Sequence, residues 1–137
     1  MPIPVAQRSK LSGVCPPARG AVVAELCRAH PAPVWLVIAE NLKAAEHLAE
    51  DIAFFHAAAG DKRIQQTLVF PESMPDTRDM REAFAASSDR LTVLSRLRAL
   101  RSRTSTPDSL VVVSTPAALL QQVPALEEFA TREFTLA

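Results

Sequence analysis

One stretch near the N-terminus has residue types and spacing close to those of a nucleotide-binding loop. Gly13 opens a G-x-x-x-x-G-K-[ST] frame, in which Ala18 replaces the second glycine, Arg19 the lysine and Gly20 the hydroxyl residue. A working loop needs glycines whose neighbouring N–H groups wrap a phosphate, a lysine that reaches its outer oxygens, and Ser or Thr to hold magnesium. Two consecutive prolines inside this frame have no N–H and a fixed φ. The sequence therefore predicts a degenerate nucleotide loop, with no catalytic residue and no cofactor bound by this segment.

The loop also has simpler interpretations. A partial match of this kind occurs by chance in turns that contain Gly and Pro, so an ordinary loop before a helix is the alternative. Arg19 occupies the position of the phosphate-binding lysine, where a helix N-terminus favours anions. A solvated first-turn arginine explains the same residue with fewer assumptions, and we favour that interpretation.

A locally basic run follows in the second half of the chain. Arg90, Arg96, Arg98, Arg101 and Arg103 have no acidic residue among them. Contact with DNA phosphates or with an acidic surface of a neighbouring module is one hypothesis, and we name Arg90, Arg96 and Arg98 as its residues. The spacing distributes the arginines around the polar side of a helix and into a loop, which favours a solvated face.

The segment Ser114-Thr115-Pro116 has two interpretations as well. It resembles the helicase motif that contacts a nucleic-acid backbone through helix-end N–H groups. The simpler interpretation is a helix cap, with Thr115 as N-cap and Pro116 in the first helical position. We favour the cap and keep Thr115 as a candidate nucleic-acid contact.

The remaining residues with reactive or metal-binding side chains are scattered. Cys15 and Cys27 have no metal-ligand spacing, and His30, His47 and His56 form no cluster. A metal site is therefore not expected, and reduced thiols are the default for a cytosolic protein.

Composition excludes several function classes. The chain has 137 residues with 48% hydrophobic content, which suits one globular domain. Fifteen basic and fifteen acidic residues give a net charge of zero, which argues against a stand-alone nucleic-acid binder. With no Tyr and one Trp, base-stacking platforms are not expected. No apolar run approaches the roughly 20 residues of a membrane span, and no signal peptide is recognisable, so we expect a cytoplasmic protein without membrane contact.

Hydrophobic patterns predict strands and helices in alternation. The first half should contain helix 19–29, a strand over 34–39 that is buried on both faces, and a strand over 67–70. Between these strands we expect a helix that Asn41 caps and that runs to about Ala59, where Gly60 ends it. The second half should contain a helix that starts at Ser87 or Ser88, a loop over 101–109, a strand over 110–113, a helix to about Gln122, a helix over 124–131, and a strand beginning at Arg132.

Two consequences follow from this order. Alternating strands and helices predict a three-layer α/β domain with a mainly parallel sheet and right-handed crossovers. Ligands of such sheets bind at the carboxyl ends of the strands, and the degenerate loop precedes the first helix. The last predicted strand is interrupted, which favours an N-terminal fragment of a larger multidomain protein.

The residues in this order resemble a known family. The chain is similar to the UvrB-homology region at the N-terminus of Mfd, the bacterial transcription-repair coupling factor, which is related to the first RecA-like domain of UvrB. The resemblance lies in Leu11–Val14, Ala32–Asn41, Leu48–Phe55, Phe70–Glu72, Ser88–Leu97 and Val111–Pro124.

Two departures favour Mfd over UvrB. UvrB keeps a working loop at the positions matching Gly13 to Gly20, and it carries a tyrosine-rich DNA-clamping hairpin, whereas this chain has no Tyr. The resemblance implies a single RecA-like (P-loop NTPase-type) domain over residues 1–137, which is non-catalytic. It implies a parent protein that displaces stalled RNA polymerase, recruits UvrA for nucleotide-excision repair, and hydrolyses ATP with Mg in a separate motor that translocates on duplex DNA.

In that family, UvrA is bound mainly by the domain that follows this region. Two other hypotheses remain open: the first domain of an active UvrB-like ATP-dependent helicase, and an α/β domain unrelated to repair.

Overall fold

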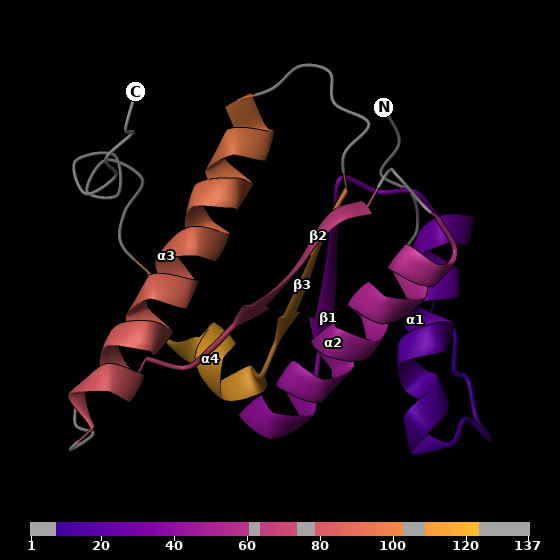
Figure 1. Cartoon of the computed structure of the whole chain (residues 1–137), viewed down its shortest axis with the longest axis horizontal. Coiled ribbons are helices and arrows are strands. Elements are labelled where there is room, and N and C mark those ends of the chain that lie inside the picture. The colour runs from indigo at the N-terminus through magenta and orange to yellow at the C-terminus, as the bar shows by residue number, and fades with distance from the viewer. Residues whose placement is uncertain (1–7, 61–63, 74–78, 103–108, 124–137) are drawn as a thin grey trace.

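A computed structural model of the chain describes residues 8–60, 64–73, 79–102 and 109–123. The elements in chain order are η1 Pro16–Ala18, α1 Arg19–Ala29, β1 Val34–Ile38, α2 Leu42–Ala58, β2 Ile64–Phe70, α3 Met80–Ser102, β3 Ser109–Ser114 and α4 Pro116–Leu120 (Figure 1). The predicted alternation of strands and helices is confirmed. The helix predicted over 124–131, the strand beginning at Arg132, and Arg103 lie outside the described residues.

The three strands form one all-parallel sheet in the order β1-β3-β2. Strand β3 lies in the centre and pairs residue by residue with β1, from Val34 with Leu110 to Ile38 with Ser114. Strand β3 has a neighbour on each side, and its residues from Leu110 to Ser114 are all buried. The continuous apolar run of this strand thus has the environment that a central parallel strand requires.

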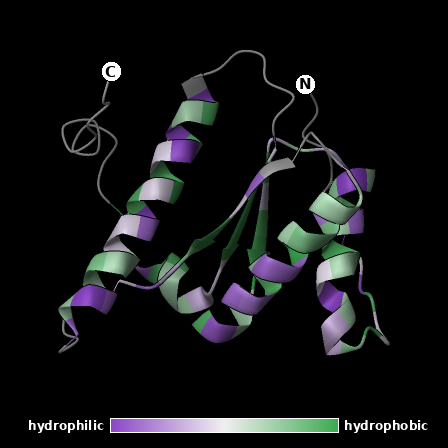
Figure 2. Cartoon of the chain, viewed as in Figure 1, coloured by the Kyte–Doolittle hydropathy of each residue, from purple (hydrophilic) through white to green (hydrophobic). Residues whose placement is uncertain are grey.

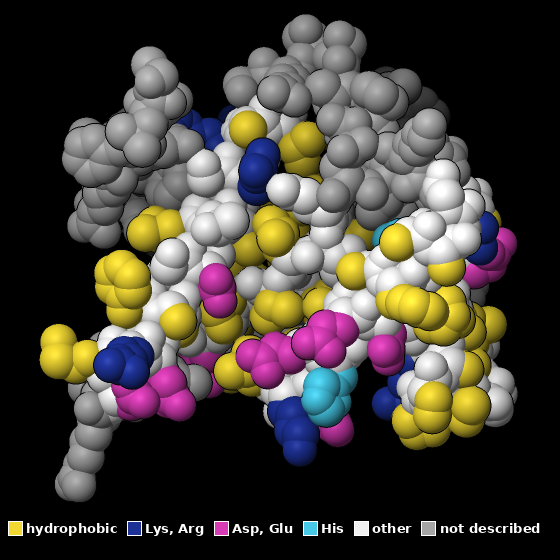
Figure 3. Space-filling model, viewed as in Figure 1, with side chains coloured by type: hydrophobic (Ala, Val, Ile, Leu, Met, Phe, Trp, Pro, Cys, Tyr) yellow, Lys and Arg dark blue, Asp and Glu magenta, His cyan; other side chains and the backbone are white. Residues whose placement is uncertain are grey.

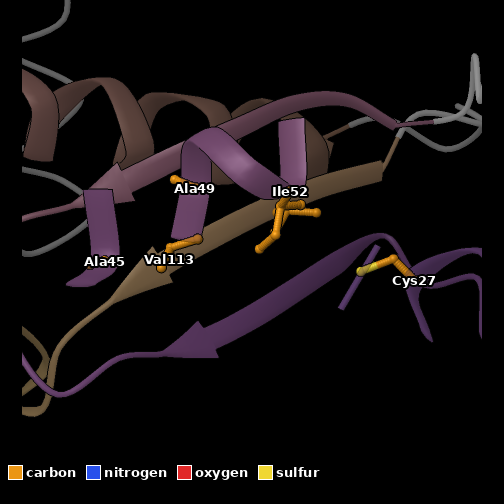
Figure 4. Close-up of a cluster of buried hydrophobic side chains, with 6 residues drawn as sticks. Cys27, Ala45, Ala49, Ile52 and Val113 are labelled. Atoms are coloured by element: carbon orange, nitrogen blue, oxygen red, sulfur yellow. The ribbon is translucent and has the colours of Figure 1, made fainter. Parts of the chain in front are cut away.

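Helices cover both faces of the sheet (Figures 1 and 2). On one face, which we call the α2 face, Ala45, Ala49 and Ile52 of α2 pack with Val113 of β3, and Cys27 of α1 belongs to the same cluster (Figure 4). On the other, which we call the α3 face, Val93 of α3 and Ala118 of α4 pack with Phe70, Leu110 and Val112. Alternate residues of β3 point to opposite faces, so this one strand contributes to both clusters.

The first strand differs from its prediction. Its apolar run predicts burial on both faces, but only the α2 face of β1 is covered, where Trp35 and Val37 pack against the core. On the α3 face Val34, Leu36 and Ile38 are 38%, 52% and 57% exposed. The prediction is wrong on this face because β1 is an edge strand in the described part of the sheet, and α3 lies over β2 and β3.

Helix α3 begins earlier than predicted, at Met80 rather than at Ser87 or Ser88. Asp79 is its N-cap: the Asp79 carboxylate accepts hydrogen bonds from the N–H groups of Arg81 and Glu82, at 2.9 and 3.4 Å. The spacing of Asp79 and Glu82 is that of a capping box, so the sequence does contain a signal for this earlier start. Of the leucines on this helix, Leu91 is 40% exposed, while Leu94, Leu97 and Leu100 pack against the core.

Other helix ends agree with their sequence signals. The Asn41 side chain accepts a hydrogen bond from Ala44 N at 2.9 Å and caps α2. Gly60 follows that helix with φ +67°, a conformation that glycine adopts without strain. Within the described ranges, no helix is long and apolar enough to cross a membrane.

Candidate functional site

The backbone of the degenerate loop is folded on itself. Pro16 to Ala18 form the short helix η1, in which Ala18 N donates to Cys15 O at 3.0 Å and Arg19 N donates to Pro16 O. Pro16 and Pro17 have no N–H to donate. The N–H groups of residues 16–19 are therefore either absent or already bonded within the turn, and none of them is directed at a ligand. A phosphate-binding loop needs the reverse arrangement, with successive N–H groups pointing into one hollow.

Gly20, at the position of the magnesium-binding hydroxyl residue, has a packing role. A Cβ atom built on Gly20 would lie 2.4 Å from the Cβ of Asp51 and 3.2 Å from its carbonyl carbon. Gly20 is buried, and it lets the first turn of α1 approach the middle of α2. A serine or threonine does not fit this contact without displacing one of the helices.

The surroundings of the loop differ from a working site in two further ways. The described residues before η1, Arg8 to Cys15, contain no strand that leads from the sheet into the loop. Gly13 has φ +77° with open space around it, so it serves a turn. Arg19 is exposed on the first turn of α1, as expected of a solvated arginine.

Arg90 does not belong to an exposed basic surface, although it is the first arginine of the basic run. Arg90 is 7% exposed, and its Nη1 donates to Pro71 O at 2.8 Å and to Ala118 O at 3.4 Å. Its guanidinium carbon lies 4.2 Å from the centre of the Phe70 ring, a cation–π contact. Burial lowers the pKa of Arg90, and the nearby Glu72 carboxylate partly offsets this effect. The expectation that Arg90 lies on a solvated face is wrong, because α3 turns this residue toward the end of β2 and toward α4.

The other arginines of the run lie apart from Arg90. Arg96 and Arg101 are exposed, and Arg98 is half-buried with a contact of its own. The exposed basic surface on the described part of α3 is therefore smaller than the sequence suggests.

Thr115 is buried and caps α4. Its hydroxyl oxygen accepts a hydrogen bond from Ala118 N at 3.2 Å, and Pro116 occupies the first helical position. The cap interpretation is confirmed. Because the Thr115 side chain is 5% exposed, it offers little surface to a nucleic-acid backbone.

Sequence reasoning missed a cleft at the carboxyl end of β2. This hollow of about 430 Å³ lies between α2 and α3 and is lined by Leu42, Glu46, Val69, Pro71, Glu82, Ala85, Ala86 and Asp89. Its charged residues are Glu46, Glu82 and Asp89, over an apolar floor. Asp and Glu side chains gather at the lower ends of α2 and α3 (Figure 3). The carboxylates come from different helices, and no single sequence motif joins them; the available signal was the rule that ligand sites lie at the carboxyl ends of parallel strands.

The acidic lining limits what this cleft can bind. A second hollow of about 370 Å³ runs along β2 and is lined by Glu46 and Glu50 together with Ala49, Ala53, Thr67 and Val69. Carboxylates repel phosphate groups, so neither hollow favours a nucleotide or a nucleic-acid backbone.

Thiol and metal chemistry have little support. Cys15 is exposed and Cys27 buried, and both are free thiols. Burial raises the pKa of Cys27 from 9.0 to about 11, so this thiol is protonated and unreactive at neutral pH. In the part of the chain that the structure describes, no three His, Cys, Asp or Glu side chains come together as metal ligands.

Comparisons of the chain with models of known protein families, with curated proteins and with solved structures found no match. The assignment of a function therefore depends on the residues and on the geometry described above.

Proposed function

We propose that this chain is the non-catalytic N-terminal module of a transcription-repair coupling factor. In this proposal residues 1–137 form one RecA-like UvrB-homology domain of the three-layer P-loop NTPase type, which is part of a larger protein. The sequence resemblance from Leu11 to Pro124 supports it, and so does the parallel sheet with a helix after each strand.

The contact of Gly20 with Asp51 is the observation that carries the non-catalytic part of the proposal. It places a helix–helix contact where a nucleotide site needs a metal-binding hydroxyl group. The N–H groups of Ala18 and Arg19 are bonded within the turn, so the phosphate cradle is missing as well. Loss of both removes the electrostatic stabilisation on which phosphoryl transfer depends.

The role of the module is then that of a scaffold. It supports the following domain, which carries the main UvrA-binding surface. Displacement of stalled RNA polymerase is the task of the whole parent protein. ATP and Mg belong to the separate motor of the parent, which translocates on duplex DNA. The acidic cleft between α2 and α3 agrees with a module that does not itself bind phosphates. Because the proposed parent protein acts on RNA polymerase and DNA, we also propose a cytoplasmic location.

Two experiments test the proposal. Calorimetric titration of the 137-residue chain with Mg-ATP should give no binding heat. A variant with Ala18→Gly and Arg19→Lys should behave in the same way, because Gly20 still packs against Asp51. Tight Mg-ATP binding by the unaltered chain would contradict the scaffold and favour the active UvrB-like helicase.

The parent is tested separately, by sequencing the reading frame beyond Ala137. A polymerase-binding module followed by an intact helicase pair would support the coupling factor. A stop codon, or one helicase half without a second motor, would favour a UvrB-like protein or an α/β domain unrelated to repair.

A further inference from the structure

Strand β2 forms one edge of the described sheet and lies at the base of both hollows. The strand order β1-β3-β2 gives β2 a single partner strand. Helix α2 packs on one face of the sheet and α3 on the other, so a cleft lined by both helices opens at this edge. Because Glu46 and Val69 line both hollows, the two adjoin and form one trough beside β2.

The hydrogen bonds of β3 indicate which of its residues face β2. Leu110 N donates to Pro33 O at 2.9 Å, and Ala39 N donates to Ser114 O at 2.8 Å, so the even-numbered residues of β3 bond with β1. Their partners in these bonds are the neighbours of the residues with which they are in register. Because backbone groups alternate in direction along a strand, the odd-numbered residues of β3 bond with β2.

This pattern leaves the backbone groups of two β2 residues at the open edge. Val111 and Val113 of β3 are in register with Thr67 and Val69, so they bond with the neighbours of these two residues. The N–H and C=O groups of Thr67 and Val69 point the other way, where no described strand lies. Val69 lines both hollows and Thr67 lines the second, so the free backbone groups border the trough.

Carboxylates line this edge from both helices. Glu46 and Glu50 lie about one turn apart on α2, and Glu82 and Asp89 lie about two turns apart on α3. Within the described ranges, none of these four forms an ion pair with Lys or Arg, and no basic residue lines either hollow. Asp and Glu side chains stand over both helices, with apolar side chains between them (Figure 3). A chain of zero net charge thus places uncompensated negative charge along an open strand.

The walls between the carboxylates are small and apolar. Ala49 and Ala53 of α2 and Ala85 and Ala86 of α3 line the trough, and their short side chains leave hollows of about 430 and 370 Å³ beside β2. The aliphatic stem of a long cationic side chain can lie on such a surface while its charged group stays at the rim. The trough therefore fits side chains that are apolar along their length and positive at their end.

We propose that β2 accepts a basic, extended segment of a partner protein as an additional strand. The backbone of this segment bonds with Thr67 and Val69, and its side chains point alternately toward α2 and toward α3. Lysine and arginine suit both directions, because each helix offers alanines to the stem and carboxylates to the charged group. A small cation would use the carboxylates alone and leave the backbone groups of the edge unpaired. This inference does not depend on the proposed function.

Charge beside an edge strand has a second known role, which is to prevent edge-to-edge aggregation. That protection commonly comes from charged side chains or prolines within the edge strand itself. Strand β2, with the sequence Ile-Gln-Gln-Thr-Leu-Val-Phe, contains neither. The carboxylates instead stand on the two helices, on either side of a space that a strand can enter. This placement favours binding over protection.

NMR titration of the 137-residue chain with the acetylated and amidated peptide Thr-Val-Lys-Arg-Lys-Val-Thr tests the proposal. Binding should be saturable and should slow hydrogen exchange at the amides of Thr67 and Val69 by about tenfold or more. The amide of Leu68, which bonds with β3, should be protected with and without peptide. The peptide with Glu at the three basic positions should not bind. Absence of saturable binding up to about 1 mM basic peptide overturns the proposal, as do Thr67 and Val69 amides that are already protected in the free chain.

A charge-matched pair of variants tests the carboxylates. Glu46→Gln with Asp89→Asn removes one carboxylate from each wall and should raise the Kd of the basic peptide about fivefold or more. The control, Glu25→Gln with Asp51→Asn, removes the same charge from residues that line neither hollow and should change the Kd by less than about twofold. Equal weakening by the two pairs overturns the proposal, because it would indicate attraction to the overall charge of the chain.

N-methylated peptides distinguish strand addition from attraction between charges. An added strand bonds with its neighbour through every second residue. Methyl groups on one alternate set of peptide nitrogens should therefore abolish binding, and methyl groups on the other set should be tolerated. Equal binding of the two methylated peptides overturns strand addition. Protection of Thr67 and Val69 that rises with protein concentration in the absence of peptide also overturns the proposal, and it identifies a second copy of the chain as the occupant.

Discussion

Replacement of Arg90 by alanine should strongly destabilise the domain, although sequence reasoning placed this residue on the surface. The change removes the hydrogen bond from Arg90 Nη1 to Pro71 O at 2.8 Å and leaves that carbonyl without the guanidinium donor. Hydrogen bonds from charged donors contribute about 1.5–3 kcal/mol. The contact with the Phe70 ring at 4.2 Å adds about 0.5–2 kcal/mol. Since the bond to Ala118 O is long, at 3.4 Å, we expect a total loss on the order of 3 kcal/mol.

Urea unfolding followed by circular dichroism measures this loss, with Trp35 fluorescence as a second probe. Arg96→Ala is the matched control, because Arg96 lies on the same helix and is exposed; it should change the free energy of unfolding by less than about 0.5 kcal/mol. Arg90→Met retains the aliphatic part of the side chain and should fall between the two. Equal slopes of free energy against urea would establish that the variants differ in stability alone. If Arg90→Ala and Arg96→Ala unfold at the same urea concentration, the structural role assigned to Arg90 is refuted.

Four further substitutions or conditions have definite expected outcomes. Gly20→Ala should destabilise the domain by about 1–3 kcal/mol in the same urea assay, because its Cβ would meet Asp51, and an unchanged midpoint would contradict the close helix contact. Thr115→Ala should cost about 1 kcal/mol through loss of the α4 cap, whereas Thr115→Ser should keep most of it. Cys27 has a folded-state pKa of about 11 against 9.0, so its contribution is complete below pH 9.0 and is lost as pH rises toward 11, by at most about 3 kcal/mol; a Cys27→Ala variant should lack this slope. At neutral pH a thiol reagent should modify Cys15 and spare Cys27 until the chain unfolds.

Local sequence signals predicted where the helices and strands lie better than they predicted how deeply each element is buried. The runs at Val34 and Leu110 both indicate apolar parallel strands, and both strands are present. Only the order of strands in the sheet makes β3 central and β1 an edge, and strand order is set by contacts between distant segments. The sequence therefore could not show that the run at Leu110 is buried on both faces and the run at Val34 on only one.

The same limit applies to the candidate site. The caps at Asn41 and Thr115 are local, since donor and acceptor lie within three residues of each other, and both were predicted. The partners of Arg90 are the carbonyl groups of Pro71 and Ala118, which the fold brings to α3 from two other segments. The acidic cleft is likewise assembled from separate helices, so its carboxylates could not be grouped before the fold was known.

The packing of Gly20 against Asp51 also restricts which sequences this domain can reach by single substitutions. A serine at position 20 would restore one element of a nucleotide loop, but it would collide with α2 before any benefit to catalysis could arise. The two positions lie in different helices, so a viable return would need a coordinated change in both, together with replacement of the prolines in the turn. A serine at position 20 alone would meet Asp51 without completing a phosphate-binding loop. In the non-catalytic module proposed above, this contact therefore makes a return to nucleotide binding through a single substitution unfavourable.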